Sequence, residues 1–280
     1  MPDLDDLPPL RDVIAAAGLR AEKALGQNFL LDSNITDKIA RQCGDLSAVN
    51  VIEIGPGPGG LTRSLLKAGA KSVTAIEFDP RAVNALQTLK EAANGRLEIV
   101  QADALETDLT ALIPAPRLIA ANLPYNIATP LLIGWLRQIR EDHGSYNAMV
   151  LMFQKEVAQR ITAPQGMKAY GRLAILSNWL CETKKLFDLP PSAFTPPPKV
   201  ASSVVRLVPK APEPNAPSFE SIEKLTEAAF GQRRKMIRSS LKNYAAALEA
   251  LAIDPSKRAE ELRIEEYIQI ARYIEMLQSR

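Results

Sequence analysis

The chain has 280 residues, of which 46% are hydrophobic, and its formal net charge is only +2. This composition excludes a disordered chain, because it can fill an apolar core, and the net charge alone indicates no nucleic-acid partner. No run approaches the ~18 apolar residues of a membrane span, and the acidic, proline-containing start is unlike a signal peptide, so we expect a cytoplasmic protein without a membrane partner.

Short apolar runs alternate with amphipathic segments through the first two thirds of the chain. Near-continuous apolar runs are typical of strands that are covered on both faces, and the amphipathic segments between them, such as Gly60–Ala68 and Asp79–Ala92, predict helices. This alternation predicts a parallel sheet with helices on both sides. The expected strands are Val49–Ile54, Ser72–Glu77, Leu97–Gln101, Arg117–Ala121 and Ala148–Phe153.

The last part of the chain changes in character. A helical stretch follows Phe153, and then Thr183–Leu189 and Ser202–Val208 alternate apolar and polar residues, which predicts two further strands at the sheet edge, at least one of them antiparallel. Proline-rich residues 209–217 predict an extended linker, and the segment beyond them has a helical period only. We therefore predict a first domain over residues 1–208 with a helical lead-in over 1–45, a linker over 209–217, and a small helical domain over 218–280.

A glycine-rich turn follows the first strand. Gly55, Gly57 and Gly60 let the backbone turn tightly and approach a ligand closely. Their spacing also satisfies the dinucleotide pattern, so an NAD-dependent oxidoreductase stays open, as does a turn without a ligand.

Two carboxylates lie at the carboxyl ends of the next two expected strands. Glu77 is placed where a carboxylate can accept hydrogen bonds from both ribose hydroxyls, and Asp103 where it can accept one from an adenine amine. Together they predict a site for an adenosyl cofactor of either type.

The motif Asn122-Leu123-Pro124-Tyr125-Asn126 follows the fourth strand. The N6 amine of adenine is a poor nucleophile, because its lone pair is delocalised into the ring. Asn122 Oδ1 and a main-chain carbonyl, that of Leu123, could accept both amine hydrogens and favour a tetrahedral nitrogen. Pro124 stiffens the turn, and Tyr125 offers an aromatic face to the base. The alternative is an ordinary turn with a buried tyrosine.

Basic residues cluster near the C-terminus. On one helix, Arg234, Arg238 and Lys242 would form a basic stripe, with Ile237 and Leu241 facing the core. Such a stripe can contact RNA phosphates, although a solvated helix face is the simpler interpretation. Its candidate residues are Arg233, Arg234, Lys235, Arg238 and Lys242.

The segment Phe194–Val200 suggests further contacts with a nucleic acid. Lys199 is a candidate phosphate contact, and Phe194 could stack on an adenine that has left its duplex, or could equally anchor the loop. Cys43, Cys181 and the single histidine, His143, have no metal-ligand spacing, so we predict no metal.

With these motifs the sequence resembles the ribosomal RNA adenine dimethyltransferases, the KsgA-type enzymes, over nearly its whole length. The resemblance implies a Rossmann-like, seven-stranded class I methyltransferase sheet with a small all-α C-terminal domain. It also implies dimethylation of two adjacent adenosines near the 3′ end of small-subunit rRNA, with S-adenosylmethionine as the cofactor. The matching segments are Leu25–Leu30, Glu53–Gly57, Asn122–Asn126, Gln154–Val157, Phe194–Val200 and Phe230–Lys235.

The resemblance also assigns roles to single residues. It places cofactor contacts on Asn28, Leu30, Gly55, Glu77, Asp103 and Asn122, to which the glycine turn adds Gly57. Tyr125 and Phe194 match the aromatic residues that would sandwich the target base, and Lys23 matches an RNA contact next to Ala24, where family members often carry a second basic or polar residue. We expect a monomer that acts on rRNA within the ribosomal small subunit or its precursor.

Three alternatives remain at this point. One is the antibiotic-resistance branch of the same superfamily, which modifies an adenine of large-subunit rRNA. The second is the NAD-dependent oxidoreductase. The third is a non-catalytic role in ribosome assembly, which the same fold could support alongside catalysis.

Overall fold

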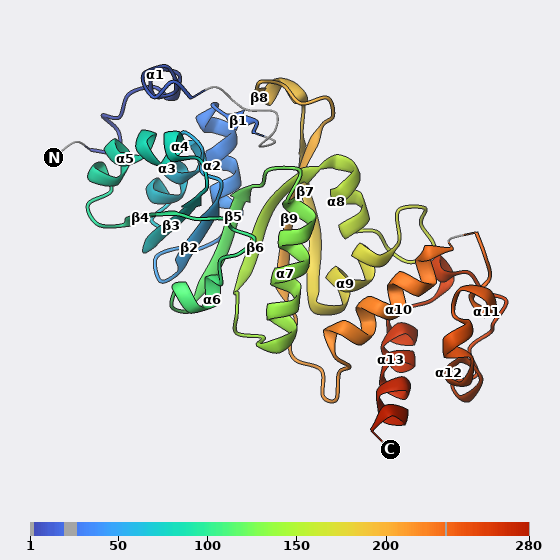
Figure 1. Cartoon of the computed structure of the whole chain (residues 1–280). Coiled ribbons are helices and arrows are strands. Elements are labelled where there is room, and N and C mark those ends of the chain that lie inside the picture. Colours follow the sequence, from blue (N-terminus) through green and yellow to red (C-terminus); the bar gives the residue numbers. More distant parts are fainter. Residues whose placement is uncertain (1–2, 20–26, 233, 280) are drawn as a thin grey trace. The chain divides into compact units, whose positions relative to one another are not determined.

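The computed structural model describes residues 3–19, 27–232 and 234–279, and a seven-stranded sheet forms its largest element (Figure 1). Neighbouring strands from β4 to β6 are parallel, and β9 is antiparallel to β6. Across the sheet the order is β4 (Leu97–Gln101), β3 (Ser72–Glu77), β2 (Asn50–Ile54), β5 (Arg117–Asn122), β6 (Ala148–Gln154), β9 (Ser202–Pro209) and β7 (Cys181–Leu189).

The sheet confirms the predicted fold class. The five expected parallel strands are present, and the bounds of β3 and β4 are those that the sequence predicts. The two late strands lie at one edge, and β9 is the antiparallel one.

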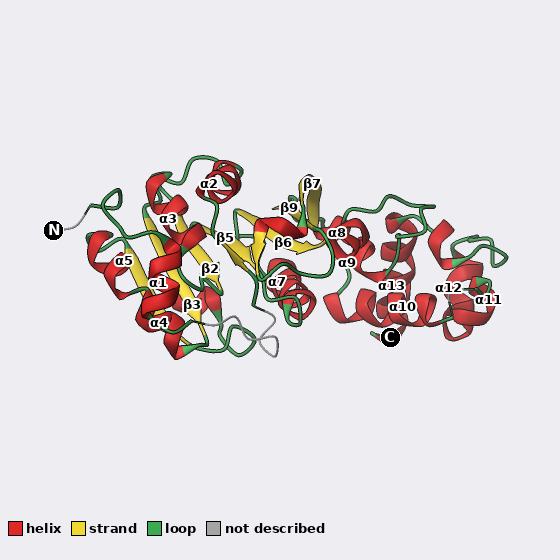
Figure 2. Cartoon of the chain, turned by 90° about the horizontal axis from the view of Figure 1, so that it is seen from above, coloured by secondary structure: helices red, strands yellow, loops and turns green. Residues whose placement is uncertain are grey.

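Both faces of the sheet are buried, which explains the continuous apolar runs. On one face, Val51, Val73 and Val150 share a core cluster with residues of the helices α2 (Ser33–Arg41), α3 (Gly60–Lys67) and α5 (Gln87–Ala92). Ile52 and Leu151 point to the other face and are equally buried. Figure 2 shows α2 and α3 on one side of the strands and α7 (Ala128–Glu141) on the other.

Further helices complete the fold. Among residues 3–19, 27–232 and 234–279, the remaining α-helices are α1 (Leu10–Ala16), α4 (Pro80–Ala85), α6 (Leu109–Leu112), α8 (Lys155–Ile161), α9 (Arg172–Leu180), α10 (Phe219–Gly231), α11 (Ile237–Ser240), α12 (Ala245–Ala250) and α13 (Ile264–Gln278), and the 3₁₀ helices are η2 (Pro191–Ala193), η3 (Lys242–Tyr244) and η4 (Ala259–Glu261). Within the described residues, no helix is both long enough and apolar enough to span a membrane.

A second sheet, of two strands, was not predicted from the sequence. β1 (Phe29–Leu30) pairs antiparallel with β8 (Phe194–Thr195), and Leu30 lies opposite Phe194. Strands of two residues are too short to leave a periodic pattern in the sequence. The pairing joins a segment near the N-terminus to the proline-rich segment before β9.

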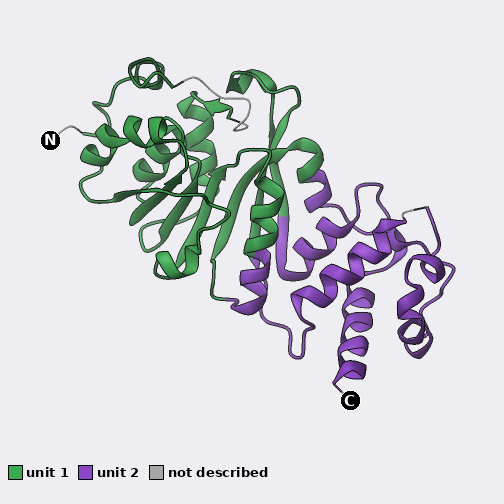
Figure 3. Ribbon diagram, viewed as in Figure 1, with its two compact units in different colours: residues 1–135, 144–158, 184–208 green, residues 136–143, 159–183, 209–280 purple. Residues whose placement is uncertain are grey.

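The chain forms two compact units (Figure 3). The first contains residues 1–135, 144–158 and 184–208, and the second contains 136–143, 159–183 and 209–280. The second unit thus includes the C-terminal helices and also α9. In it, Trp179 stacks on Phe219 with ring centroids 6.3 Å apart, and Glu223 binds Arg137 at 2.9 Å and Arg172 at 2.7 Å.

The proline-rich segment between β9 and α10 has no helix or strand over residues 210–217. Its carbonyl groups are nevertheless held by two arginines of the second unit. Arg140 donates to the carbonyls of Ala216 and Pro217, and Arg272 donates to that of Asn215. The segment is not extended throughout, because the N–H of Ala216 donates to the carbonyl of Glu213 and Asn215 has a φ of +55°. The two arginines bind its second half.

The prediction that Arg234, Arg238 and Lys242 form a stripe on one helix is wrong. α10 ends at Gly231, and Met236 is extended and forms a β-bridge with Arg258. The N–H of the next residue, Ile237, then donates to the carbonyl of Lys257, so tertiary hydrogen bonds replace a continuous helix. The buried positions of Ile237 and Leu241 are confirmed.

Candidate active site

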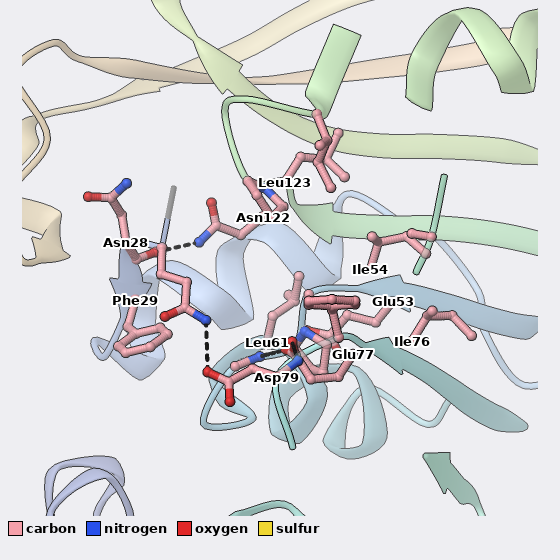
Figure 4. A pocket seen from close by; sticks show the side chains of 18 of the residues that line it. Asn28, Phe29, Glu53, Ile54, Leu61, Ile76, Glu77, Asp79, Asn122 and Leu123 are labelled. Atoms are coloured by element: carbon pink, nitrogen blue, oxygen red, sulfur yellow. Dashed lines mark hydrogen bonds between the residues drawn. The ribbon is translucent and has the colours of Figure 1, made fainter. Parts of the chain in front are cut away.

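A pocket in the first unit lies at the carboxyl ends of the parallel strands β2 to β5 (Figure 4). Doubly wound sheets bind ligands at this edge, because the turns after successive strands converge there. The segment that contains β1 supplies the rest of the wall. The lining residues are 27–30, 53–58, 60, 61, 76–79, 102–105 and 122–127.

The glycine turn after β2 depends on positive backbone angles. Gly55, Gly57 and Gly59 have φ values of +65°, +54° and +88°, which residues with a Cβ rarely adopt. A Cβ on Gly57 would also lie 3.0 Å from the ring of Phe29. Glycine at this position therefore lets the turn pass beneath the segment that forms β1.

Replacing Gly57 by alanine should destabilise the fold more than the same change at Gly69. Both positions have positive φ, but a Cβ on Gly69 would meet nothing within 4 Å. The two variants share the backbone strain, and only Gly57→Ala adds overpacking against Phe29, for which we expect an extra loss of about 2 kcal/mol. Urea unfolding of both variants measures the difference. Equal losses of unfolding free energy in the two variants would show that the Phe29 ring moves aside without an energetic cost.

Glu77 ends β3 inside the pocket, and its carboxylate is buried. Oε2 accepts a hydrogen bond from the N–H of Gly57 at 3.1 Å, and Oε1 accepts one from the N–H of Asp79 at 2.9 Å. Burial raises the pKa of Glu77, while these backbone hydrogen bonds oppose the rise. Each carboxylate oxygen can still accept another hydrogen bond, so Glu77 can take two hydroxyl groups at once.

A second carboxyl group, that of Glu53, lines the same pocket and was missed by the sequence analysis. Its side chain is buried in β2, and Oε2 has no hydrogen-bond partner among the described residues. Burial raises the pKa of Glu53 to about 8, and the nearby charge of Glu77 adds to the rise. Glu53 therefore holds a proton at neutral pH and can donate a hydrogen bond. Its one signal in the sequence is a charged residue within an apolar strand.

Asp103 lies in the turn after β4. Its Oδ1 accepts a hydrogen bond from the N–H of Leu105 at 2.9 Å, which fixes the carboxylate within the pocket wall. Two apolar side chains of the same wall, Phe78 and Leu105, are 61% and 48% exposed. Exposed apolar groups beside a fixed carboxylate suit a flat ring that carries an amine.

Asn122 closes the pocket at the end of β5. Its Nδ2 donates a hydrogen bond of 2.9 Å to the carbonyl oxygen of Asn28 (Figure 4). Because a carbonyl can only accept, this contact fixes which way the amide faces. Oδ1 accepts no hydrogen bond from the described residues and is available to a ligand.

The residues after Asn122 shape the mouth of the pocket. The Leu123 side chain is buried, and the ring of Pro124 packs close to Gly55. Tyr125 is half-buried on the pocket wall, and its Oη lies 2.6 Å from Ser202 Oγ.

The expected cofactor contacts come together in the structure. Asn28 and Leu30 enter the pocket from the segment of β1, and the others lie at the ends of β3 and β5 or in the turns after β2 and β4. The set in the pocket wall is Asn28, Leu30, Gly55, Gly57, Glu77, Asp103 and Asn122. Five separate chain segments thus present one concave site.

The comparisons with known proteins agree with this geometry. The family described as ribosomal RNA adenine dimethylase matches residues 18–276 of the chain. The chain belongs to the ribosomal RNA adenine dimethylase family. An oxidoreductase built on the same glycine turn is thereby excluded.

Three relatives illustrate the range of the similarity. Ribosomal RNA small subunit methyltransferase A of Rhodospirillum rubrum is 53% identical over 275 residues, which cover 97% of this chain and 94% of the relative. The solved dimethyladenosine transferase from Plasmodium falciparum is 27% identical, with a TM-score of 0.73 and coverage of 88% and 96%. The solved 23S rRNA methyltransferase ErmE is 25% identical, with a TM-score of 0.66 and coverage of 89% and 100%.

Phe194 of this dimethylase lies outside the pocket wall. Its side chain is only 3% exposed and belongs to the core cluster that also contains Leu30. In this arrangement the ring anchors the segment of β8, the second of the two roles weighed from the sequence. Stacking on a target base would require the segment to move, and that role stays a prediction.

The basic residues expected to contact RNA in this dimethylase are exposed wherever the structure describes them. Lys199 precedes β9 in the first unit. Arg234, Lys235, Arg238 and Lys242 lie in the second unit, on the turns and short helices between α10 and α12. Lys23 and Arg233 lie outside the described residues.

The cysteine side chains of the dimethylase take no part in the pocket. Cys43 and Cys181 are buried free thiols, and burial raises the pKa of each to about 12, which makes them unreactive. Among the described residues, no three His, Cys, Asp or Glu side chains gather as metal ligands would.

Proposed function

We propose that this dimethylase methylates the N6 amines of two adjacent adenosines near the 3′ end of small-subunit ribosomal RNA, using S-adenosylmethionine. The observation that carries the proposal is the position of Asn122. Its free Oδ1 opens into the pocket that also contains the glycine turn, Glu77 and Asp103. One pocket can therefore hold an adenosyl group and present an acceptor to a second adenine.

The pocket residues fit an adenosyl cofactor. Glu77 has one free acceptor site on each oxygen for a pair of ribose hydroxyls, and Asp103 lies beside the exposed Phe78 and Leu105, which suit an adenine ring. The absence of a Cβ at Gly57 leaves the backbone accessible. When bound, S-adenosylmethionine supplies a methyl group activated by a sulfonium.

The protein's contribution to the reaction is to hold the target amine. Asn122 Oδ1 and the carbonyl of Leu123 accept its two hydrogens, which favours a tetrahedral nitrogen with a localised lone pair. Tyr125 supports the base, and apolar side chains such as Ile54 and Leu61 exclude water. The amine proton becomes acidic only after the methyl group has been transferred, so the site has to orient the amine rather than deprotonate it.

The small subunit is the preferred substrate over the large one. The relative from Rhodospirillum rubrum, named for the small subunit, is 53% identical, whereas ErmE, named for 23S rRNA, is 25% identical. We further propose that the chain acts as a cytoplasmic monomer on rRNA within the small subunit or its precursor.

The test is to incubate the full chain with labelled S-adenosylmethionine and unmodified small subunits, then digest the RNA to nucleosides. We expect labelled N6,N6-dimethyladenosine from small-subunit rRNA. Large-subunit rRNA from the same strain serves as the comparison. Label that appears only in the large-subunit sample would favour the antibiotic-resistance branch.

Reversing the charge of Arg238 should weaken RNA binding. Arg238 is exposed, so its guanidinium can neutralise a phosphate. Each phosphate contact that is lost makes the negative slope of log K against log salt less steep by about 0.7–0.9. Binding of small-subunit rRNA to Arg238→Glu at several salt concentrations measures this. Lys224→Glu is the matched control, because Glu220 already pairs with Lys224 at 2.6 Å. An unchanged salt slope for Arg238→Glu would contradict the phosphate contact.

A further inference from the structure

The tyrosine of the pocket is tethered to a strand that does not otherwise reach the site. Tyr125 lies in the turn after β5, whereas Ser202 is the first residue of β9. Their side-chain oxygens are 2.6 Å apart, a short hydrogen bond between hydroxyl groups. In the sheet, β6 separates β5 from β9, so the tyrosine ring spans the end of β6.

Ser202 is itself held firmly. Its side chain is completely buried, and it faces Gln154 in the antiparallel pairing of β6 with β9. The main chain just before it is also fixed, because the N–H of Lys155 donates to the carbonyl of Ala201 at 2.9 Å. The Ser202 hydroxyl is therefore a rigid reference point for whatever bonds to it.

The tether restricts the side chain that faces the target base. A tyrosine ring turns about two side-chain torsions, and fixing the hydroxyl at its far end limits both. Burial raises the pKa of Tyr125, so the phenol stays protonated at neutral pH and does not act as a base. The hydroxyl therefore acts by fixing the position of the Tyr125 ring, and the faces of the ring contact the base.

We propose that Ser202 is a positioning residue for methyl transfer, because its hydroxyl fixes the Tyr125 ring in the orientation that receives the target adenine. This inference rests on the proposed function. It extends that function to a residue outside the pocket wall, which acts on the substrate only through Tyr125. A small misplacement of the base lowers the reaction rate steeply, so loss of the tether should reduce turnover while leaving cofactor binding intact.

The experiment compares Ser202→Ala, Tyr125→Phe and the double variant in the full chain. Each single variant removes the same hydrogen bond from one end. We expect each to lower kcat for small-subunit rRNA about 10-fold, and the double variant to be no slower than either. The affinity for S-adenosylhomocysteine, measured by calorimetry, should stay within about twofold of the unaltered chain.

Ser203→Ala is the matched control. Ser203 is the next residue of β9 and is equally buried, but its hydroxyl donates to Asp188 at 2.8 Å instead of to the tyrosine. We expect kcat of this variant to stay within about twofold of the unaltered chain. A merely structural effect of losing a buried serine hydroxyl would lower kcat equally in both serine variants.

Two results would overturn the role of Ser202: unaltered kcat in Ser202→Ala, or a double variant whose loss is the product of the single losses. If Ser202→Ala does not fold, Tyr125→Phe alone decides, and full turnover by that variant contradicts the proposal. Failure of the unaltered chain to methylate adenosine counts instead against the proposed function. The two failures are thus distinguishable.

Discussion

Asn122→Ala should lose roughly 10²- to 10³-fold in methylation rate, the loss typical of removing one preorganised polar group from a reaction centre. The variant lacks the Oδ1 acceptor for the target amine. It should still fold, because the side chain makes one hydrogen bond to the residues that the structure describes, with the Asn28 carbonyl, and losing that bond costs only about 1 kcal/mol. Single-turnover methylation of small subunits measures the rate, and thermal unfolding checks the fold.

Asn122→Asp tests the orientation of the amide. An aspartate keeps an acceptor oxygen but cannot donate to the Asn28 carbonyl, and a negative charge facing that carbonyl is repelled. We expect this variant to be nearly as slow as Asn122→Ala. Near-normal activity would mean that the contact with Asn28 does not position the acceptor.

The same variants separate catalysis from a role in ribosome assembly. In a strain that carries only Asn122→Ala, the adenosines should remain unmethylated. An assembly defect as large as that of a deletion strain would assign the whole phenotype to methylation. Normal assembly would show that the protein also acts without catalysis.

Glu77→Gln should weaken binding of S-adenosylmethionine about 100-fold, because hydrogen bonds to a charged acceptor contribute about 1.5–3 kcal/mol each. The amide also turns a donor toward the N–H of either Gly57 or Asp79, which removes one of the two backbone contacts. Calorimetric titration with S-adenosylmethionine measures the affinity. Glu98→Gln is the charge-matched control, since Glu98 lies in β4 and is exposed. Equal affinities for the two variants would exclude Glu77 from the site.

The pH dependence of Glu77 has opposite signs for affinity and for stability. Burial raises its pKa, so acidification protonates Glu77 at a higher pH than an ordinary glutamate, and affinity should fall as the pH falls through that value. Protonation relieves the cost of burying the charge, so this group's contribution to stability is present at low pH and lost as the pH rises through the pKa of the folded state. Titrations of affinity and of urea unfolding should show these opposite trends, and both trends should be weaker in Glu77→Gln, in which the buried Glu53 still contributes to the pH dependence of stability.

The sequence predicted the parts of the fold that are governed by local pattern. β3 and β4 have the expected bounds because a strand that is buried on both faces must be apolar throughout. Glu77 is the last residue of β3 and Asp103 lies two residues after β4, so the parallel topology brings both carboxylates to the pocket.

Other features depend on contacts that no local pattern records. The helix expected through Arg234 and Arg238 is interrupted because Met236 pairs with Arg258, a residue far along the chain. Phe194 is buried by pairing with β1, and Ser202 meets Tyr125 only because β9 inserts beside β6. Glu53 was not predicted as a site residue because it lies within a strand whose other residues are buried for packing.

Within the part of the chain that the structure describes, the pocket wall uses residues between 27 and 127 only, a stretch of less than half of the chain. The helices after β9 can therefore change over evolutionary time without altering a pocket-lining residue. Divergence in choice of RNA target requires no new way of handling the methyl donor. Because the pocket and the later helices are separate parts of the chain, the fold can be shared with ErmE at only 25% identity.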